Sequence, residues 1–300
     1  MANSVLESTT SFTCKNCGAT TNAVAEGSSI RCPFCGSEHV IAGPQDKNAP
    51  SPEALIPFSF PDGQVEAAYR SWLGEGFFRP KDITAKAHSH KMRAVYIPIW
   101  ESSGVAESEW HAQAGYTEET PAPPSNPPKP PSTRTRWERA SGRHSETYER
   151  VLISGSKGLP QDWVGRAGDF DWGAIQGYDP NFLIGREVER STLDRRAALE
   201  AARLHIEDSE RDECASLVPG DTQKDLRVST AVSDLSTRLI YIPVWLASFG
   251  YGDKTYRCVV NGQTGKVSGE APLNAFRVTA VILAVVGLIA AIVLLIMLFT

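Results

Sequence analysis

The sequence predicts an α+β protein with an N-terminal zinc ribbon, a duplicated α+β domain with antiparallel β meanders, and one C-terminal transmembrane helix. Three observations predict this class: two CxxC pairs near the N-terminus, two nearly identical segments reading YIPIW and YIPVW, and a long C-terminal run without a charged residue. The expected parts are a ribbon over residues 10–42, a linker over 43–53, the α+β domain over 54–273 and a membrane helix over 278–299.

The ribbon segment, residues 12–41, reads FTCKNCGATTNAVAEGSSIRCPFCGSEHVI. Each CxxC turn can direct two thiolates at one ion, so Cys14, Cys17, Cys32 and Cys35 predict a tetrahedral zinc site. Because four thiolates leave no open coordination position, the zinc is expected to be structural rather than catalytic. The metal would supply folding energy that so short a segment cannot obtain from a hydrophobic core.

Redox chemistry is the alternative for the second pair, since Cys32-Pro33-Phe34-Cys35 resembles the CPxC centre of glutaredoxin-like proteins. Such a centre should follow a strand and open a helix inside a βαβ unit. Gly36-Ser37 follows here instead, and a second CxxC pair lies nearby, so the sequence favours zinc. Clustered rather than dispersed cysteines also indicate a reducing compartment, the cytosol.

The central region contains a pattern that occurs twice. A helical pattern is followed by extended sequence and then by YIPIW at residues 96–100, and the same order leads to YIPVW at residues 241–245. This repetition predicts two halves of duplicated origin. Their expected limits are about 54–155 and 178–273.

The strands of this domain are expected to be short. Pro98 and Pro243 should lie at a strand edge or bulge, because proline cannot donate a hydrogen bond to a ladder. In the first half a strand is expected at Arg134–Ala140, followed by a turn at Arg139–Arg143. A proline-rich insertion, residues 117–133, is expected to be a solvated polyproline-like loop.

The C-terminal run VTAVILAVVGLIAAIVLLIMLFT exceeds the ~20 residues that cross about 30 Å of hydrocarbon. A buried core helix of this length would carry polar positions along one side, and only Thr279 interrupts the run before its last residue. Arg277 marks the near boundary, so the positive-inside rule places residues 1–277 in the cytoplasm and predicts a single-pass anchor in the cytoplasmic membrane. Small residues four apart, such as Gly287 and Ala291, raise the alternative of a homodimer through this helix.

Together these motifs resemble a bacterial family of membrane-anchored zinc-ribbon proteins without an established activity, some members of which carry a label borrowed from the primosomal replication helicase. The resemblance covers nearly the whole chain and implies the architecture above. Of functional residues it carries over only the four zinc cysteines. Besides the CxxC…CPFC ribbon and the two YIPxW segments, it rests on LIPFSF at 55–60, LISGSKGLP at 152–160, YDPNFLIGREVE at 178–189 and VVNGQTGKVSGEAP at 259–272.

A helicase activity is excluded by the residues themselves. The segment Gly262-Gln263-Thr264-Gly265-Lys266 superficially suggests a phosphate loop. That motif needs four residues between its glycines and Ser or Thr after the lysine, whereas here two residues separate the glycines and Val267 follows. A hairpin turn is therefore predicted at this place.

Nucleic-acid binding is the more serious alternative, because zinc ribbons often serve it. A net charge of −5 and a pI near 5.8 argue against it. Four thiolates around zinc would also make the ribbon acidic, whereas phosphate contact gains affinity from basic patches. The one basic region, Lys129–Arg143, is expected to be a solvated loop, with an anionic membrane surface as its alternative partner.

No catalytic constellation is apparent, so no enzyme is expected. His88 and His90 would share a face of a strand, but lysines on both sides make a second metal site there unattractive. Cys214 and Cys258 are expected to be ordinary, partly buried thiols rather than nucleophiles. The function predicted is binding or scaffolding of a protein partner at the cytoplasmic membrane face. The alternatives are a membrane-tethered nucleic-acid binder and an enzyme with its site between the two halves.

Overall fold

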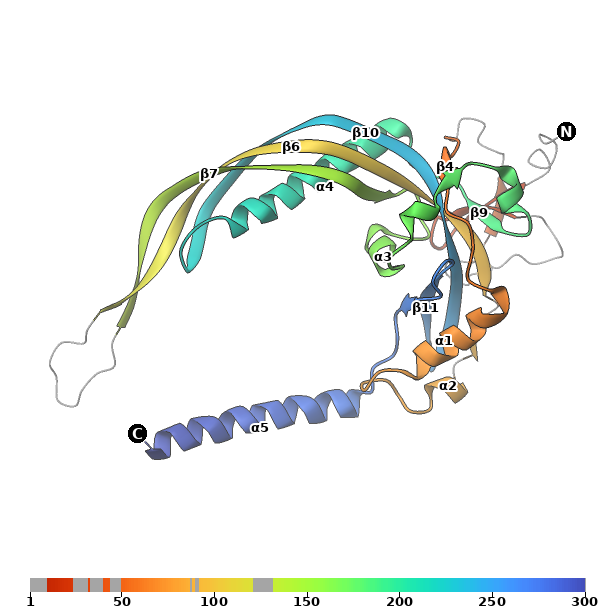
Figure 1. Ribbon diagram of the computed structural model, residues 1–300. Coiled ribbons are helices and arrows are strands. Elements are labelled where there is room, and N and C mark those ends of the chain that lie inside the picture. Colours follow the sequence, from red (N-terminus) through yellow and green to blue (C-terminus); the bar gives the residue numbers. More distant parts are fainter. Residues whose placement is uncertain are drawn as a thin grey trace. The chain divides into compact units, whose positions relative to one another are not determined.

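The computed structural model describes residues 10–23, 32, 40–43, 50–86, 88–89, 92–120 and 132–299. They form a mixed α+β fold in which the described strands join into one twelve-stranded sheet (Figure 1). The strands are β1 Thr10–Cys14, β2 Thr20–Ala23, β3 Val40–Gly43, β4 Ala54–Leu55, β5 His88–Ser89, β6 Arg93–Thr120, β7 Ser132–Ser154, β8 Gln176–Gly177, β9 Glu187–Glu189, β10 Thr222–Tyr251, β11 Lys254–Asn261 and β12 Val267–Gly269. The helices are α1 Val65–Gly74, α2 Ile83–Lys86, α3 Gln161–Arg166, α4 Arg195–Ser216 and α5 Ala275–Phe299, with short 3₁₀ turns η1 Asp62–Gln64, η2 Trp172–Ala174 and η3 Pro180–Leu183.

The chain divides into two compact units that interleave along the sequence. The first unit consists of Met1–Pro98, Ser156–Thr192 and Ile240–Thr300, and the second of Ile99–Gly155 and Leu193–Leu239. Each unit therefore takes segments from both expected halves, 54–155 and 178–273. The compact units do not follow the sequence halves.

The second unit is built on long strands with α4 along one face (Figure 1). The buried face of α4 repeats every four residues, as a helix requires, and it is Ala198, Ala202, Ile206, Glu210 and Cys214. These side chains pack against the β6–β7 hairpin, with Trp100 and Val151 in the same cluster. The helix begins at Asp194, whose carboxylate accepts a hydrogen bond from the Ala197 amide at 2.7 Å.

Strand β7 differs from the sequence expectation, which placed a turn at Arg139–Arg143. The strand runs without interruption for 23 residues, and it pairs with β6 from Ile99↔Ser154 to Thr120↔Ser132 with one irregularity near Ser102. The turn expectation was wrong because polar residues on both faces look like a loop in sequence. Here they are tolerated because no residue from 133 to 150 is buried, so polar side chains on either face reach water.

Pro98 and Pro243 lie inside long strands rather than at edge strands. On one side of β6 the partner is β9 up to Tyr96 and β7 from Ile99 onwards, so Pro98 falls where the partner changes. Pro243 falls at the equivalent place in β10, between the β4 pairing that ends at Tyr241 and the β11 pairing that begins at Val244. A missing N–H costs least where one partner strand ends and the next begins.

The order short strand, helix, long strand, hairpin strand occurs twice, as β4–α1–β6–β7 and β9–α4–β10–β11. Each short strand pairs in parallel with the long strand of the other set, since Leu55 pairs with Tyr241 and Val188 with Tyr96. The helices are exchanged in the same way: α1 packs against β10 and β11, and α4 packs against β6 and β7. The two sets are interlocked rather than side by side.

The first unit has its core around the two equivalent tyrosines. Tyr96 and Tyr241 are buried with ring centroids 6.2 Å apart, and Leu55 packs against both. A neighbouring cluster joins Tyr69 of α1 to Phe249 of β10. These clusters fix the place of β9, the strand onto which the cysteine-containing strands are added.

Candidate metal centre

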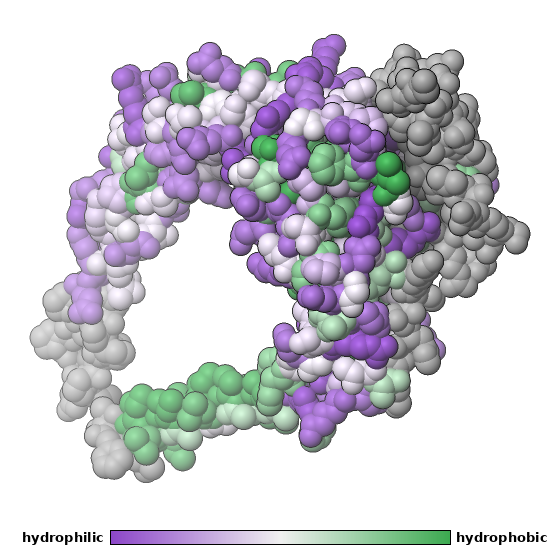
Figure 2. All heavy atoms as spheres, turned by 45° about the vertical axis from the view of Figure 1, so that its right-hand side comes forward, coloured by the Kyte–Doolittle hydropathy of each residue, from purple (hydrophilic) through white to green (hydrophobic). Residues whose placement is uncertain are grey.

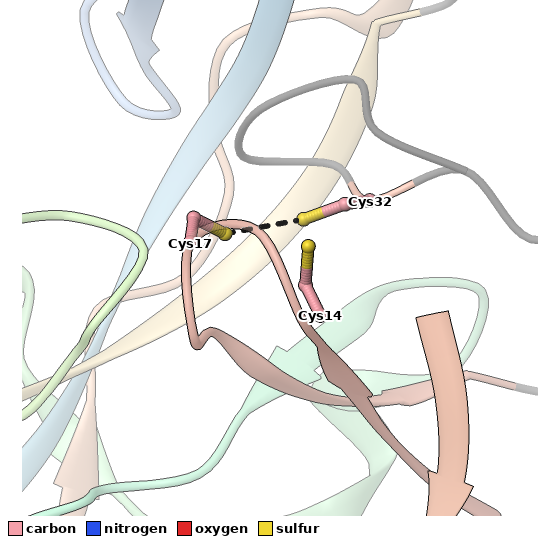
Figure 3. Close-up of side chains that lie close together, drawn as sticks. All are labelled: Cys14, Cys17 and Cys32. Atoms are coloured by element: carbon pink, nitrogen blue, oxygen red, sulfur yellow. Dashed lines mark hydrogen bonds between the residues drawn. The ribbon is translucent and has the colours of Figure 1, made fainter. Parts of the chain in front are cut away.

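Three of the four predicted zinc ligands lie close together next to the N-terminal strands β1 and β2 (Figure 3). The sulfur atoms of Cys14, Cys17 and Cys32 lie within 4.8 Å of one another, and those of Cys17 and Cys32 are 3.5 Å apart. Cys14 and Cys32 are buried, and Cys17 is half-buried. Cys35 lies outside the described residues.

The backbone of the first CxxC turn explains why both thiolates point the same way. The amide of Gly18 donates to the carbonyl of Cys14 at 2.9 Å, and the amide of Cys14 donates to the carbonyl of Ala19 at the same distance. Gly18 has a φ of 76°, which a residue without Cβ adopts most readily. Gly18 therefore has the backbone conformation that this turn needs.

This donor set fits a metal ion. Thiolates arranged tetrahedrally at the usual Zn–S length of about 2.3 Å have sulfur–sulfur edges of about 3.8 Å. The observed spacing is close to such an edge, so a small adjustment would place the three sulfurs on one ion. Three thiolates within this distance can bind a metal, and soft ligands of this type suit zinc.

The strands that carry the cysteines are part of the main sheet. β1 pairs with β2 and β3, and β2 pairs antiparallel with β9 through Thr21↔Glu189 and Asn22↔Val188. The amide of Arg190 extends this ladder by donating to the carbonyl of Thr20 at 3.3 Å. The cysteine-containing segment is thus continuous with the first unit.

A buried carboxylate, that of Glu189 in β9, stabilises this junction. Glu189 is fully buried and accepts hydrogen bonds from the Ser156 hydroxyl and from the Gly158 amide, the latter at 3.2 Å. Burial raises the pKa of Glu189 to about 8, although these hydrogen bonds act in the opposite direction. Lys157 lies between its two partners, and its side chain reaches Gly18 of the knuckle. The LISGSKGLP and YDPNFLIGREVE motifs therefore meet where the cysteine segment joins the sheet.

A second polar cluster lies in the second unit and was not predicted. Glu210 of α4 is fully buried and accepts from Ser108 at 2.7 Å, Tyr148 at 2.9 Å and His144 at 3.0 Å. Glu146 completes a His144–Glu146–Glu210 group with ligand atoms within 4.8 Å. Both carboxylate oxygens of Glu210 have protein hydrogen-bond donors, which is the arrangement of a satisfied structural network.

The pKa values of this cluster follow from its contacts. The hydrogen bond to Glu210 raises the pKa of His144, with burial opposing the shift. Burial by itself would raise the pKa of Glu210, but hydrogen bonds from its three partners outweigh burial and lower it. A signal for this network existed in the sequence, since Glu210 interrupts the apolar stripe of α4 at four-residue spacing. His144 carries no comparable signal, because its partner is 66 residues away in the sequence.

From Ser132 onwards the basic region forms part of the β6–β7 hairpin rather than an inserted loop, and Lys129 lies outside the described residues. Arg136 pairs with Glu118 at 2.6 Å and Arg143 with Glu109 at 2.7 Å, each across the two strands. These pairs are exposed and contribute little to stability. They neutralise the charges of Arg136 and Arg143, and so part of the positive charge of this region.

The NGQTG segment forms a turn, as predicted. The Asn261 side chain accepts from the amides of Gln263 at 2.8 Å and Thr264 at 3.1 Å. Its amide group donates to the carbonyl of Ala167 at 3.1 Å, and Asn261 is fully buried. The backbone amides that a phosphate loop would offer to a nucleotide are here occupied by Asn261.

The remaining candidates are dispersed. His88 lies in β5 opposite Gly250, and His90 lies outside the described residues. Cys214 and Cys258 are buried, in different units, and burial raises the pKa of each thiol. Both thiols are therefore more deeply buried than the sequence led us to expect.

Helix α5 is long and apolar enough to span a membrane. A 23-residue candidate span, Ala275–Met297, has a mean hydropathy of 3.3, and none of it is buried. Figure 2 shows apolar side chains along the helix.

Comparison with known proteins places few limits on function. No protein-family model and no solved structure matches this chain. The chain is 22% identical over 231 residues to the uncharacterized protein YdjG of Bacillus subtilis (strain 168), a match that covers 77% of this chain. It covers 66% of that relative, so this chain spans slightly less than two thirds of the relative's length. The likeness is distant, and the relative's printed description names no activity.

Proposed function

We propose that this chain is a zinc protein held at the cell membrane by α5, where it binds a protein partner on the cytoplasmic side. The observation that carries the proposal is the exposure of α5. A helix of this length and apolar composition, none of whose residues from Ala275 to Met297 is buried, would be strongly unfavourable in water, and a bilayer removes that cost. Arg277 at its start favours a cytoplasmic location for the two units, because positive charge next to a span lies preferentially on the cytoplasmic side.

The zinc in this proposal is structural. Cys14, Cys17, Cys32 and Cys35 would complete a closed four-thiolate shell with no position for a substrate or water. Since β2 adds directly to β9, the metal would hold the added strands in place. Metal binding and the folding of this segment would then be coupled.

A groove on α4 is the proposed binding surface. It has a volume of about 480 Å³, and its lining residues are Arg195, Arg196, Leu199, Glu200, Arg203 and Leu235. Three arginines against one glutamate give it positive charge, and the two leucines give it an apolar floor. Such a surface suits an acidic segment with an apolar anchor.

The interlocked element sets support a duplicated origin for the two halves. Tyr96 and Tyr241 occupy equivalent places, each paired in parallel with a short strand and followed two residues later by proline. Two unrelated halves would not be expected to share this order of strand pairings. The duplication would explain why YIPIW and YIPVW are nearly identical.

Nucleic-acid binding is a weaker proposal for this chain. Arg136 and Arg143 of β7 are paired with carboxylates of β6, and phosphate contact gains affinity from cations that are not already neutralised. The net charge of −5 acts in the same direction.

The test is affinity capture of the full chain from detergent-solubilised native membranes, with protein and nucleic acid both analysed. We expect a defined protein partner that is lost from Arg196→Glu/Arg203→Glu and retained by Arg211→Glu, an exposed charge reversal on the same helix outside the groove. A Cys14→Ser/Cys32→Ser variant measures how far binding depends on the metal. Nuclease-sensitive nucleic acid without a stable protein partner would contradict the proposal.

A further inference from the structure

The loop Gly76–Arg79, called here the aromatic loop, presents two phenylalanines to solvent. Phe77 is 68% exposed and Phe78 is 38% exposed, and their rings meet edge to face with centroids 5.3 Å apart. The loop joins the C-terminal end of α1 to the segment before α2. Exposed aromatic pairs on a loop are unusual unless another apolar surface covers them.

The aromatic loop is bonded to the start of α5. The amide of Asn274 donates to the carbonyl of Phe78 at 2.7 Å. The guanidinium of Arg277 donates to the carbonyl of Phe77 at 2.6 Å and to that of Arg79 at 3.2 Å. Arg277 also lies 5.7 Å from the centroid of the Phe77 ring, so a residue in the first turn of α5 holds the loop by backbone and ring contacts.

Further exposed apolar side chains flank this junction. Leu273 precedes α5 and is 67% exposed, and Phe276 in its first turn is 81% exposed. With Phe77 and Phe78 they form an apolar patch next to the cationic group of Arg277. Its residues Leu273 and Phe276 come just before Val278, where the uncharged run of α5 starts.

This combination has the composition of a membrane–water interface. Aromatic side chains gather at the level of the lipid headgroups, and arginine at the end of a span interacts with lipid phosphates. If α5 crosses the bilayer from Val278 onwards, Arg277 lies at headgroup level, and its contacts bring the aromatic loop to the same depth. The aromatic loop then lies in the same headgroup layer that α5 passes through.

We propose that the aromatic loop inserts into the headgroup region of the bilayer, giving the first unit a second contact with the membrane besides α5. This inference rests on the proposed membrane anchor. The contact would fix how the first unit is oriented on the bilayer. A single helix leaves the unit free to rotate and tilt, whereas a helix and a loop attach it at two points. Phe77 is the residue expected to reach deepest among the loop residues, since its ring is the more exposed.

The test places the photocrosslinker p-benzoylphenylalanine at one position at a time in the full chain, reconstituted in phosphatidylethanolamine–phosphatidylglycerol vesicles. The positions are Phe77, Ile184 as a control that is 72% exposed on a separate turn, and Ile289 inside α5. Phe77 and Ile184 are exposed apolar residues, so neither substitution removes a core side chain. Lipid adducts are measured by mass spectrometry after irradiation.

We expect lipid adducts at Ile289 and at Phe77, with several-fold fewer at Ile184. Adducts at Ile289 with equal yields at Phe77 and Ile184 would overturn the aromatic-loop contact while leaving the anchor intact. An absence of lipid adducts at Ile289 would overturn the anchor itself and the inference with it. Crosslinks from Phe77 to protein instead of lipid would show that a partner covers the patch.

Discussion

Thr21 of β2 pairs antiparallel with Glu189 of β9, and through this pair the cysteine-containing strands become part of the main sheet. The carboxylate of Glu189 is turned into the interior, where Ser156 and Gly158 donate to it. The cysteine-containing segment is therefore supported by residues far along the chain. Its folding should affect the edge of the sheet and not only the N-terminus.

Cys14→Ser is expected to abolish zinc binding and to release the added strands. A tetrahedral site with three thiolates binds zinc far more weakly, and this segment has little core of its own. Purified wild-type chain should contain about one zinc ion by elemental analysis, and the variant close to none. Limited proteolysis should then cleave the variant within residues 10–43 first.

Cys214→Ala is the matched control, because this buried thiol belongs to the second unit and not to the cysteine cluster. It should retain zinc. Cys35→Ser tests the fourth ligand, for which the sequence alone argues, and zinc retained at wild-type affinity in that variant would contradict a four-cysteine site.

The sequence predicted the convergence of the cysteines but not the junction with β9. CxxC spacing carries its own geometry, so Cys14 and Cys17 could be assigned without any knowledge of the fold. The pairing of Thr21 with Glu189 joins residues that nothing local connects, and β9 is only three residues long. Pairing between such short and distant strands leaves no periodicity to read.

Glu210→Ala is expected to destabilise the second unit by about 3 kcal/mol, because it removes the buried carboxylate that accepts hydrogen bonds from Ser108, Tyr148 and His144. The measurement is urea unfolding of the full chain in detergent, followed by hydrogen exchange of the α4 amides. Glu213→Ala is the control, since Glu213 lies on the same helix but is exposed. Equal effects of the two substitutions would show that the network adds nothing beyond helix propensity.

The His144–Glu210 pair should make the stability of the second unit depend on pH. The pKa of Glu210 is lowered from its ordinary 4.5, so its contribution is present above that value and is lost as the pH falls through the folded pKa. The pKa of His144 is raised from its ordinary 6.5, so its contribution is present below that value and is lost as the pH rises through the raised pKa. The pair therefore stabilises most between these two ordinary values.

His144→Gln should flatten this dependence at the alkaline side. Hydrogen exchange of the α4 amides in the wild-type chain should quicken more between about pH 6 and about pH 8 than base catalysis of exchange accounts for, and the variant should lose that excess. His205→Gln, an exposed histidine on α4, should behave as wild type. An unchanged excess in His144→Gln would rule out this pair as its source.

The interleaving of the two units also lay beyond the sequence. The YIPIW and YIPVW segments showed that a pattern repeats, and the helix before each was expected. Which hairpin each helix covers depends on tertiary packing, and both hairpins offer apolar faces. Pairing of Leu55 with Tyr241 and of Val188 with Tyr96 decides it, because each short strand carries its following helix to the other set.

Gly265→Ala is expected to destabilise the first unit by about 2–4 kcal/mol, more than the same change at Gly252. Both glycines have positive φ, 73° and 61°, so alanine costs about 1–2 kcal/mol of backbone strain at each. A Cβ at Gly265 would in addition overlap the ring of Phe60, whereas nothing lies within 4 Å at Gly252. Urea unfolding of both variants in detergent measures the difference. Equal losses would mean that Phe60 moves freely, and that the turn after Asn261 is not held against the LIPFSF segment.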